Sequence, residues 1–246
     1  MELLPSIDLR RGRVVRLRQG DDGARTDYGG DPLQVLERYA AAGVRWIHLV
    51  DLDAAFGEAG QWALVAELVA AGRRHGLAGL QLGGGLRDRQ AVATALEAGC
   101  ERVVLGSLVG RRPEEFRRLA EDWPERLVPA LDVRRGAVRL EGWTVSADRS
   151  LDELCAALRS LPCPGVLVTD ISRDGTLDGP NLELTAQVGA ASALPAWVSG
   201  GVRSLGDLEA ARDTPGIAGA VVGRALYEEA FTIGDAVAVC RQEVAP

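Results

Sequence analysis

The sequence predicts a (β/α)8 barrel, on the strength of two observations. Short runs rich in Val, Ile and Leu recur eight times along the 246 residues, and amphipathic stretches separate them. Runs that are apolar on both faces are typical of parallel strands buried between helices. Eight strand–helix units in a chain of this length fit the barrel, while a doubly wound open sheet is the alternative that the same pattern allows.

The expected elements follow one another in a regular order. Strands are expected at Leu3–Ile7, Ile47–Leu52, Leu77–Leu82, Arg102–Leu105, Leu127–Val133, Val166–Ile171, Ala196–Ser199 and Ala220–Gly223. Amphipathic helices are expected at Pro32–Ala42, Gln61–His75, Asp88–Ala98, Pro113–Ala120, Leu151–Ser160 and Leu205–Arg212. Asp31 and Ser204 precede two of these helices and have the side chains that helix N-caps prefer.

The second observation is an internal repeat of about half the chain. The segment Pro5-Ser-Ile-Asp-Leu-Arg-Arg-Gly12 returns as Pro129-Ala-Leu-Asp-Val-Arg-Arg-Gly136, and the other strand ends recur in the same order. A repeat of this length indicates two half-barrels related by a pseudo-twofold axis. We therefore expect one barrel domain over residues 1–246, with half-barrels at about 1–123 and 124–246.

The composition excludes several classes of chemistry. The chain has 28 basic residues and no lysine, so neither Schiff-base catalysis nor a Walker-type phosphate loop is available. With two histidines, His48 and His75, an HExxH zinc site cannot be built, and we expect no metal. Acid–base catalysis then falls to carboxylates.

Charge and cysteine content predict a cytoplasmic protein without nucleic-acid or membrane partners. The net charge of −7 does not favour binding to nucleic acids or to anionic membranes. The N-terminus is charged too early for a signal peptide, and no apolar run is long enough to span a bilayer. The four cysteines form no CxxC pair and are expected to be buried thiols.

Asp8 and Asp132 are the candidate catalytic residues. They occupy repeat-related positions at the carboxyl ends of the first and fifth strands, where barrel active sites lie. Two carboxylates that face one another across a pocket suit a general acid and a general base. The alternative is that one or both aspartates cap a turn or pair with Arg10 or Arg134.

Glycine pairs at other strand ends predict two phosphate sites. Glycine lets main-chain N–H groups approach phosphate oxygens, and a helix that begins there adds a favourable dipole. One set is expected to be Gly84, Gly85, Gly106 and Ser107, and the other Gly200, Gly201, Gly223 and Arg224, with a short extra helix from Arg224. Taken singly, such a pair is often only a turn. Two sets at one mouth predict a substrate with a phosphate at each end.

Polar side chains at the remaining strand ends are candidate substrate contacts. Thr169 and Asp174 are placed to bind a carboxylate or a sugar hydroxyl, and Trp143 is placed to stack on a heterocycle or to cover the barrel. His48, Asp51 and Arg87 are further candidates, although a histidine within a strand can equally be structural.

Together these segments resemble a known family over almost the whole chain. PSIDLRRGRVVRLRQGD, HLVDLDAAFG, GGGLRD, VTDISRDGTLDGPNL, SGGVRSLGDL and VVGRALYE resemble, in order and spacing, the phosphoribosylformimino-aminoimidazole carboxamide ribotide isomerases of histidine biosynthesis. The resemblance implies a half-barrel duplicate that performs an Amadori rearrangement, from aminoaldose to aminoketose, without metal or organic cofactor.

The resemblance also implies roles for single residues. Asp8 would take the C2′ proton and Asp132 would protonate the ring oxygen to open the ribose. Thr169 and Asp174 would assist, Arg16 would contact the substrate, and Trp143 would lie over it in a closed state. The glycine sets would hold the two phosphates. Gly83 departs from many relatives, which have serine there. We expect a monomer.

Three other functions remain open. Some members of this family also isomerise phosphoribosylanthranilate for tryptophan synthesis. Glu141, in the loop before Gly-Trp143 where those members carry arginine, predicts weak or absent turnover of that anionic substrate. The chain is alternatively a non-catalytic phosphate-ligand binder, which two intact aspartates disfavour. A cyclase-like protein that docks a glutaminase is the third alternative, and the sequence shows no docking feature for it.

Overall fold

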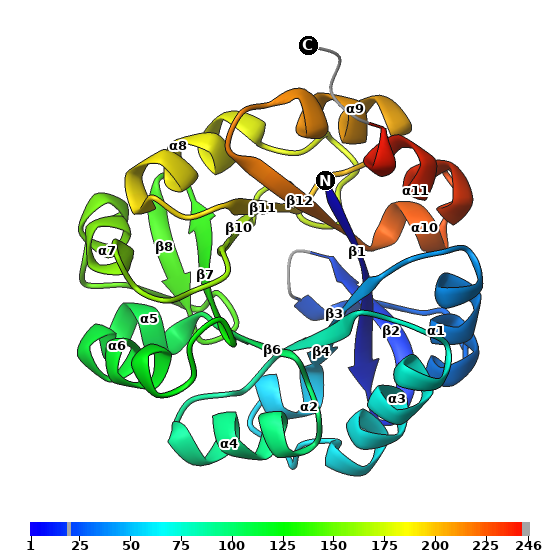
Figure 1. Cartoon of the computed structure of the whole chain (residues 1–246), viewed down its shortest axis with the longest axis horizontal. Helices are drawn as coiled ribbons and strands as arrows, with labels where there is room; N and C mark the ends of the chain where they lie inside the picture. Colours follow the sequence, from blue (N-terminus) through cyan, green and yellow to red (C-terminus); the bar gives the residue numbers. More distant parts are fainter. Residues whose placement is uncertain (19–20, 243–246) are drawn as a thin grey trace.

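Eight parallel strands close into a ring, which confirms the predicted barrel (Figure 1). The computed structural model describes residues 1–18 and 21–242. Strand β12 pairs with β1 at one seam and β10 pairs with β7 at the other, so the ring has no free edge. The ring strands are β1 (Glu2–Arg10), β4 (Trp46–Asp51), β5 (Gly79–Gly83), β6 (Arg102–Leu105), β7 (Leu127–Arg134), β10 (Val166–Asp170), β11 (Ala196–Ser199) and β12 (Ile217–Val222).

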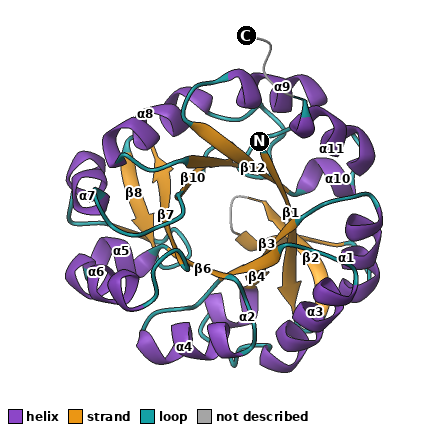
Figure 2. Ribbon diagram, in the orientation of Figure 1, coloured by secondary structure: helices purple, strands orange, loops and turns teal. Residues whose placement is uncertain are grey.

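Helices surround the ring on its outside (Figure 2). No helix among the described residues is long and apolar enough to cross a bilayer. The longer helices are α1 (Pro32–Ala41), α3 (Trp62–Arg74), α4 (Arg89–Glu97), α6 (Pro113–Asp122), α7 (Leu151–Leu158), α8 (Leu182–Ser192), α9 (Leu205–Asp213) and α11 (Ile233–Arg241). Three short helices, α2 (Leu52–Ala55), α5 (Ser107–Arg111) and α10 (Arg224–Tyr227), directly follow β4, β6 and β12 at their carboxyl ends.

Antiparallel extensions follow the first and fifth ring strands. β2 (Arg13–Arg18) and β3 (Asp21–Asp27) extend β1, and β8 (Ala137–Leu140) and β9 (Val145–Ser146) extend β7. Both tight turns use the same left-handed conformations, with φ of 51° and 74° at Arg11-Gly12 and of 52° and 78° at Arg135-Gly136. The repeat in the sequence predicts short strands at Val14–Leu17 and Val138–Leu140, which β2 and β8 confirm, whereas β3 and β9 are not predicted.

Element boundaries differ from prediction where tertiary contacts decide them. β5 begins at Gly79 instead of Leu77, because the Leu77 amide donates to Gly72 O at the end of α3, 3.0 Å away. Helices α8 and α11 lie outside the predicted ranges. The expected half-barrel boundary falls in the turn between α6 and β7, and the division into half-barrels stays a prediction.

The core has two main parts and a small third cluster of Val15, Leu17 and Leu52. A large cluster packs the outer faces of the strands against the helices. A smaller one fills the barrel interior with Leu4, Val104, Val128, Ala130, Leu167, Trp197 and Val221. No fully buried member of this interior cluster comes from β4 or β5, where His48 and Gln81 are buried instead.

Candidate active site

A cavity of about 260 Å³ opens at the carboxyl ends of the ring strands. This is the face that carries active sites in such barrels. Most of the predicted site residues line it: Asp8, His48, Gly84, Gly85, Arg87, Gly106, Ser107, Asp132, Trp143, Thr169, Asp174, Gly200, Gly201, Gly223 and Arg224. Asp51 lies apart from this lining, and Arg16 lies on β2 with a side chain outside the described part of the chain.

The two catalytic candidates face the cavity from opposite walls, because four strand steps separate β1 from β7 in either direction around the ring. Asp8 is buried on β1 and accepts a hydrogen bond from Ser6 Oγ at 2.6 Å. Alternate residues of a strand point to the same face, so Ser6 and Asp8 both reach the cavity.

Asp132 is bound by donors from other elements. Trp143 Nε1 donates to its Oδ2 at 2.8 Å. Burial raises the pKa of Asp132, hydrogen bonds from Thr169 and Trp143 oppose that rise, and the nearby charge of Asp174 adds to it. The result is a raised pKa, which favours a protonated carboxyl group able to donate a proton.

Arg139 holds the loop that carries Trp143. Its guanidinium donates to Trp143 O at 3.2 Å, to Thr144 O at 3.0 Å and to Ser146 Oγ at 2.5 Å. Trp143 itself has a left-handed backbone, with φ of 71°. These contacts direct the indole over the cavity instead of into solvent.

Both glycine pairs lie where neighbouring loops approach each other too closely for a larger residue. Gly84, Gly85, Gly200 and Gly201 have φ of 98°, 68°, 87° and 88°. A Cβ on Gly85 would lie 2.3 Å from the carbonyl of Ala54, and one on Gly201 would lie 2.4 Å from Gly179 O. In both halves the loop after one strand therefore packs directly on the backbone of the preceding loop.

The second part of each phosphate set begins a short helix. Gly106 and Gly223 are the N-cap residues of α5 and α10. Ser107 Oγ accepts from the Glu141 amide at 3.0 Å, which ties α5 to the Trp143 loop. Arg224 donates to Gly175 O at 2.5 Å and pairs with Glu228 at 2.6 Å.

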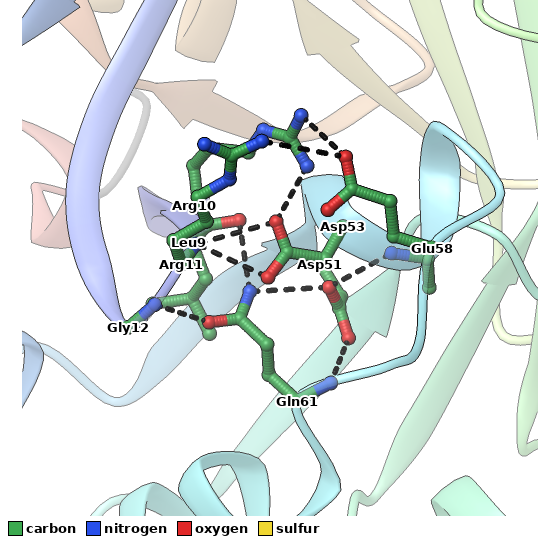
Figure 3. A network of polar contacts seen from close by, with 9 residues as sticks. Leu9, Arg10, Arg11, Gly12, Asp51, Asp53, Glu58 and Gln61 are labelled. Carbon is green, nitrogen blue, oxygen red and sulfur yellow. Dashed lines mark hydrogen bonds and ion pairs between the residues drawn. The ribbon is translucent and has the colours of Figure 1, made fainter.

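Asp51 forms hydrogen bonds that stabilise the loop after β4, as Figure 3 shows. Its carboxylate caps α2 through the Ala54 amide at 3.1 Å and accepts from Gln61 N at 2.7 Å and Gln61 Nε2 at 3.2 Å. Its repeat counterpart Asp170 accepts from Asn181 Nδ2 at 2.7 Å. In each half, an aspartate at a strand end thus closes a loop by binding the N-cap residue of the next long helix.

A buried ion pair anchors the same loop (Figure 3). Arg10 Nη1 lies 2.7 Å from Asp53 Oδ1, and its Nη2 lies 2.8 Å from Glu58 Oε1. The Arg10 guanidinium also lies 5.0 Å from the centre of the Phe56 ring, which lines the cavity. The alternative of a pair between Arg10 and Asp8 stays a prediction.

Two further candidates reach the cavity from β4 and β5 and their loops. His48 Nδ1 lies 2.8 Å from Gln81 Nε2, and Arg87 Nη2 donates to Ala55 O at 3.0 Å. The prediction missed Ser6 and Arg139 as site residues. Ser6 was detectable from its place two residues before Asp8, whereas the loop fold that brings Arg139 to Trp143 left no pattern in the sequence.

Comparison with known proteins places the chain in a family. The family described as "Histidine biosynthesis protein" matches residues 2–232. The chain belongs to this family. The resemblance noted in the sequence is thereby confirmed for the histidine biosynthesis proteins as a family.

Individual relatives are similar over almost their whole length. A Nocardioides protein named 1-(5-phosphoribosyl)-5-((5-phosphoribosylamino)methylideneamino) imidazole-4-carboxamide isomerase is 42% identical over 98% of this chain and 97% of its own. A protein of the same name from Acidothermus cellulolyticus is 43% identical over 96% and 97%. A Streptomyces griseus protein named Phosphoribosyl isomerase A is 43% identical over 96% and 97%. None of these names mentions phosphoribosylanthranilate.

Proposed function

We propose that the chain isomerises the doubly phosphorylated imidazole carboxamide ribotide, converting its N′-phosphoribosyl group into a phosphoribulosyl group in an Amadori rearrangement of histidine biosynthesis. The observation that carries the proposal is the placement of Asp8 and Asp132 on opposite walls of one cavity, in a chain whose relatives are named for this isomerisation.

The chemistry requires one acid and one base. Asp132, whose pKa burial raises, donates a proton to the ribose ring oxygen and opens the ring. Asp8 then removes the C2′ proton, and the resulting enolamine rearranges to the ketose form. Thr169 lies next to Asp132 across the β7–β10 pairing, and Asp174 lies in the same cavity, where both are placed to orient substrate hydroxyls.

The ends of the substrate are held by the two glycine sets. Positive φ and close loop packing turn the backbone at Gly84-Gly85 and Gly200-Gly201 toward the cavity mouth. The short helices α5 and α10 begin beside these turns. Repeat-related loops on two sides of one mouth suit two phosphates, one at each end of the substrate.

Asp8→Asn tests the assignment of the base. We expect turnover to fall by a factor of about 10³ or more, because the amide cannot accept the proton. Binding of the doubly phosphorylated product, measured by titration calorimetry, should stay within about tenfold of wild type since both glycine sets are intact. Normal turnover by this variant would contradict the assignment.

A parallel assay on phosphoribosylanthranilate tests substrate range. Glu141 lines the cavity, and we expect weak or absent turnover of this anionic substrate. Its carboxylate pairs with Arg111 at 2.7 Å, so the repulsion is smaller than an unpaired charge would give. Comparable kcat/KM values for the two substrates would show that Glu141 does not set specificity.

We further propose that the chain acts as a monomer in the cytoplasm, on a small molecule instead of a nucleic acid. One chain supplies both carboxylates and both glycine sets. The four cysteines are buried free thiols, which suits a reducing compartment. Sedimentation equilibrium at assay concentration tests the monomer.

A further inference from the structure

A row of three buried polar side chains lies beside Asp8 in the barrel wall. Ser6 on β1 pairs in register with His48 on β4, and His48 pairs with Gln81 on β5. Their exposed fractions are 2%, 7% and 0%. We refer to Ser6, His48 and Gln81 as the polar row.

The other half of the barrel has apolar side chains at the repeat-related positions. Ala130, Leu167 and Trp197 lie on β7, β10 and β11 with the corresponding register, Leu167 between the other two. All three belong to the apolar interior cluster. Burying polar groups costs free energy, so packing alone does not explain the polar row.

Ser6 is fixed at both its backbone and its side chain. Its carbonyl accepts from Tyr227 Oη at 2.8 Å, and its hydroxyl lies 2.6 Å from Asp8 Oδ1. A hydroxyl that donates to a carboxylate stabilises the ionised form and limits its rotation. At the repeat-related position, Ala130 has no hydroxyl to offer Asp132.

Asp132 instead receives its hydrogen bonds from neighbouring elements. Trp143 donates from the loop between β8 and β9, and Thr169 donates from β10. The residue that faces Asp8 in register on β4 is Val50, which has no donor. The two carboxylates thus occupy equivalent places in the repeat but have non-equivalent partners.

We propose that Ser6 is a positioning residue that orients the Asp8 carboxylate as the proton acceptor, and that this difference between Ser6 and Ala130 separates the base from the acid in an otherwise repeated barrel. This inference rests on the proposed function, in which Asp8 takes the C2′ proton. The side chain acts through Asp8 and not on the substrate.

The variant Ser6→Ala copies the second half of the repeat and tests the inference. We expect kcat to fall about tenfold or more, the loss expected from removing one hydrogen bond to a charged group. KM and the affinity for the doubly phosphorylated product should stay within about threefold, because the phosphate sites are unchanged. Ser6→Thr keeps the hydroxyl and should recover most of kcat.

A matched double variant moves the hydroxyl to the other half of the barrel. Ser6→Ala combined with Ala130→Ser keeps the total number of hydroxyl groups and should remain as impaired as Ser6→Ala alone. Recovery of kcat in the double variant would overturn the proposal, because the hydroxyl would then act without regard to its place beside Asp8. Circular dichroism and thermal unfolding verify that each variant is folded.

The failures of the two proposals can be told apart. Wild-type kcat in Ser6→Ala together with an inactive Asp8→Asn would overturn the role of Ser6 and leave the proposed function in place. An active Asp8→Asn would overturn the assignment of the base and, with it, the role of Ser6.

Discussion

Carboxylates at equivalent positions of this barrel have different hydrogen-bond partners, and we expect those partners to set the role of each carboxylate. Asp8 and Asp132 are equivalent in the repeat, yet Asp8 is bound by a hydroxyl of its own strand and Asp132 by an indole from a loop. Asp51, a third carboxylate at a strand end, caps α2 and binds Gln61. Position at a strand end is therefore shared by functional and structural carboxylates.

The stability of Asp132→Asn should depend on pH differently from that of wild type. Because the pKa of Asp132 is raised in the folded state, the folded protein holds this proton more tightly than the unfolded chain does. The resulting stability is complete below the ordinary aspartate pKa and is lost as the pH rises through the raised value. The neutral asparagine has no such loss.

We therefore expect the free energy of unfolding of Asp132→Asn to gain on that of wild type over the range above the ordinary aspartate pKa of about 4. Urea unfolding at several pH values measures both curves. A constant difference between them over this range would show that burial does not perturb this carboxyl group. The same variant should lose turnover, since it cannot donate the proton that opens the ring.

At the scale of elements, loops after neighbouring strands are packed on one another through glycine. Gly85 has φ of 68°, and a Cβ there would meet the Ala54 carbonyl at 2.3 Å. Gly83, two residues earlier in β5, has only ordinary contacts, the nearest at 3.5 Å from Val104 Cβ. The two glycines form a matched pair for substitution.

Gly85→Ala should lower the free energy of unfolding by about 2 kcal/mol, through backbone strain and a forced shift of the loop that follows β4. Gly83→Ala should change it by less than about 0.5 kcal/mol. Chemical denaturation of both variants provides the comparison. Equal losses in the free energy of unfolding for the two variants would mean that the backbone at Gly85 is not conformationally constrained.

At the scale of the whole molecule, one end of the barrel carries the cavity and the other end is closed by packed side chains. The carboxyl ends of the strands carry the cavity. At the other end Arg102 lies 3.8 Å from the Trp46 ring centre and 4.9 Å from that of Trp197, and its guanidinium binds Glu2 at 3.0 Å. Trp197 Nε1 also binds Glu2, at 2.9 Å. This cluster closes the amino-terminal end of the barrel.

Arg102→Gln should destabilise the protein by about 2 kcal/mol or more, because a desolvated cation–π contact and a hydrogen bond to a charged group each contribute about that much. Its kcat should not change, because the cluster lies at the opposite end from the cavity. Arg89→Gln is the control: Arg89 lies 4.9 Å from the Trp123 ring and pairs with Asp122 at the surface, where such contacts contribute little. A fall in kcat for Arg102→Gln would contradict this separation.

The sequence by itself determined the eight ring strands, six of the eight longer helices and the family. Buried parallel strands must be apolar, tight turns require glycine, and both requirements leave local patterns. The aspartates at the ends of the first and fifth strands were found because their tetrapeptides recur. The roles of these site residues stay predictions until the variants are measured.

Tertiary structure alone decided which polar groups meet. The contact between Trp143 and Asp132 depends on Arg139 folding a loop back on itself. The binding of Asp51 to Gln61 joins residues that the α2 loop brings together. Such contacts depend on the path of the backbone in space. A hydrogen bond between two side chains produces no periodic pattern in the sequence of either segment, so the sequence alone does not predict it. The pattern therefore located the mouth of the barrel, and only the folded chain assigned a partner to each side chain there.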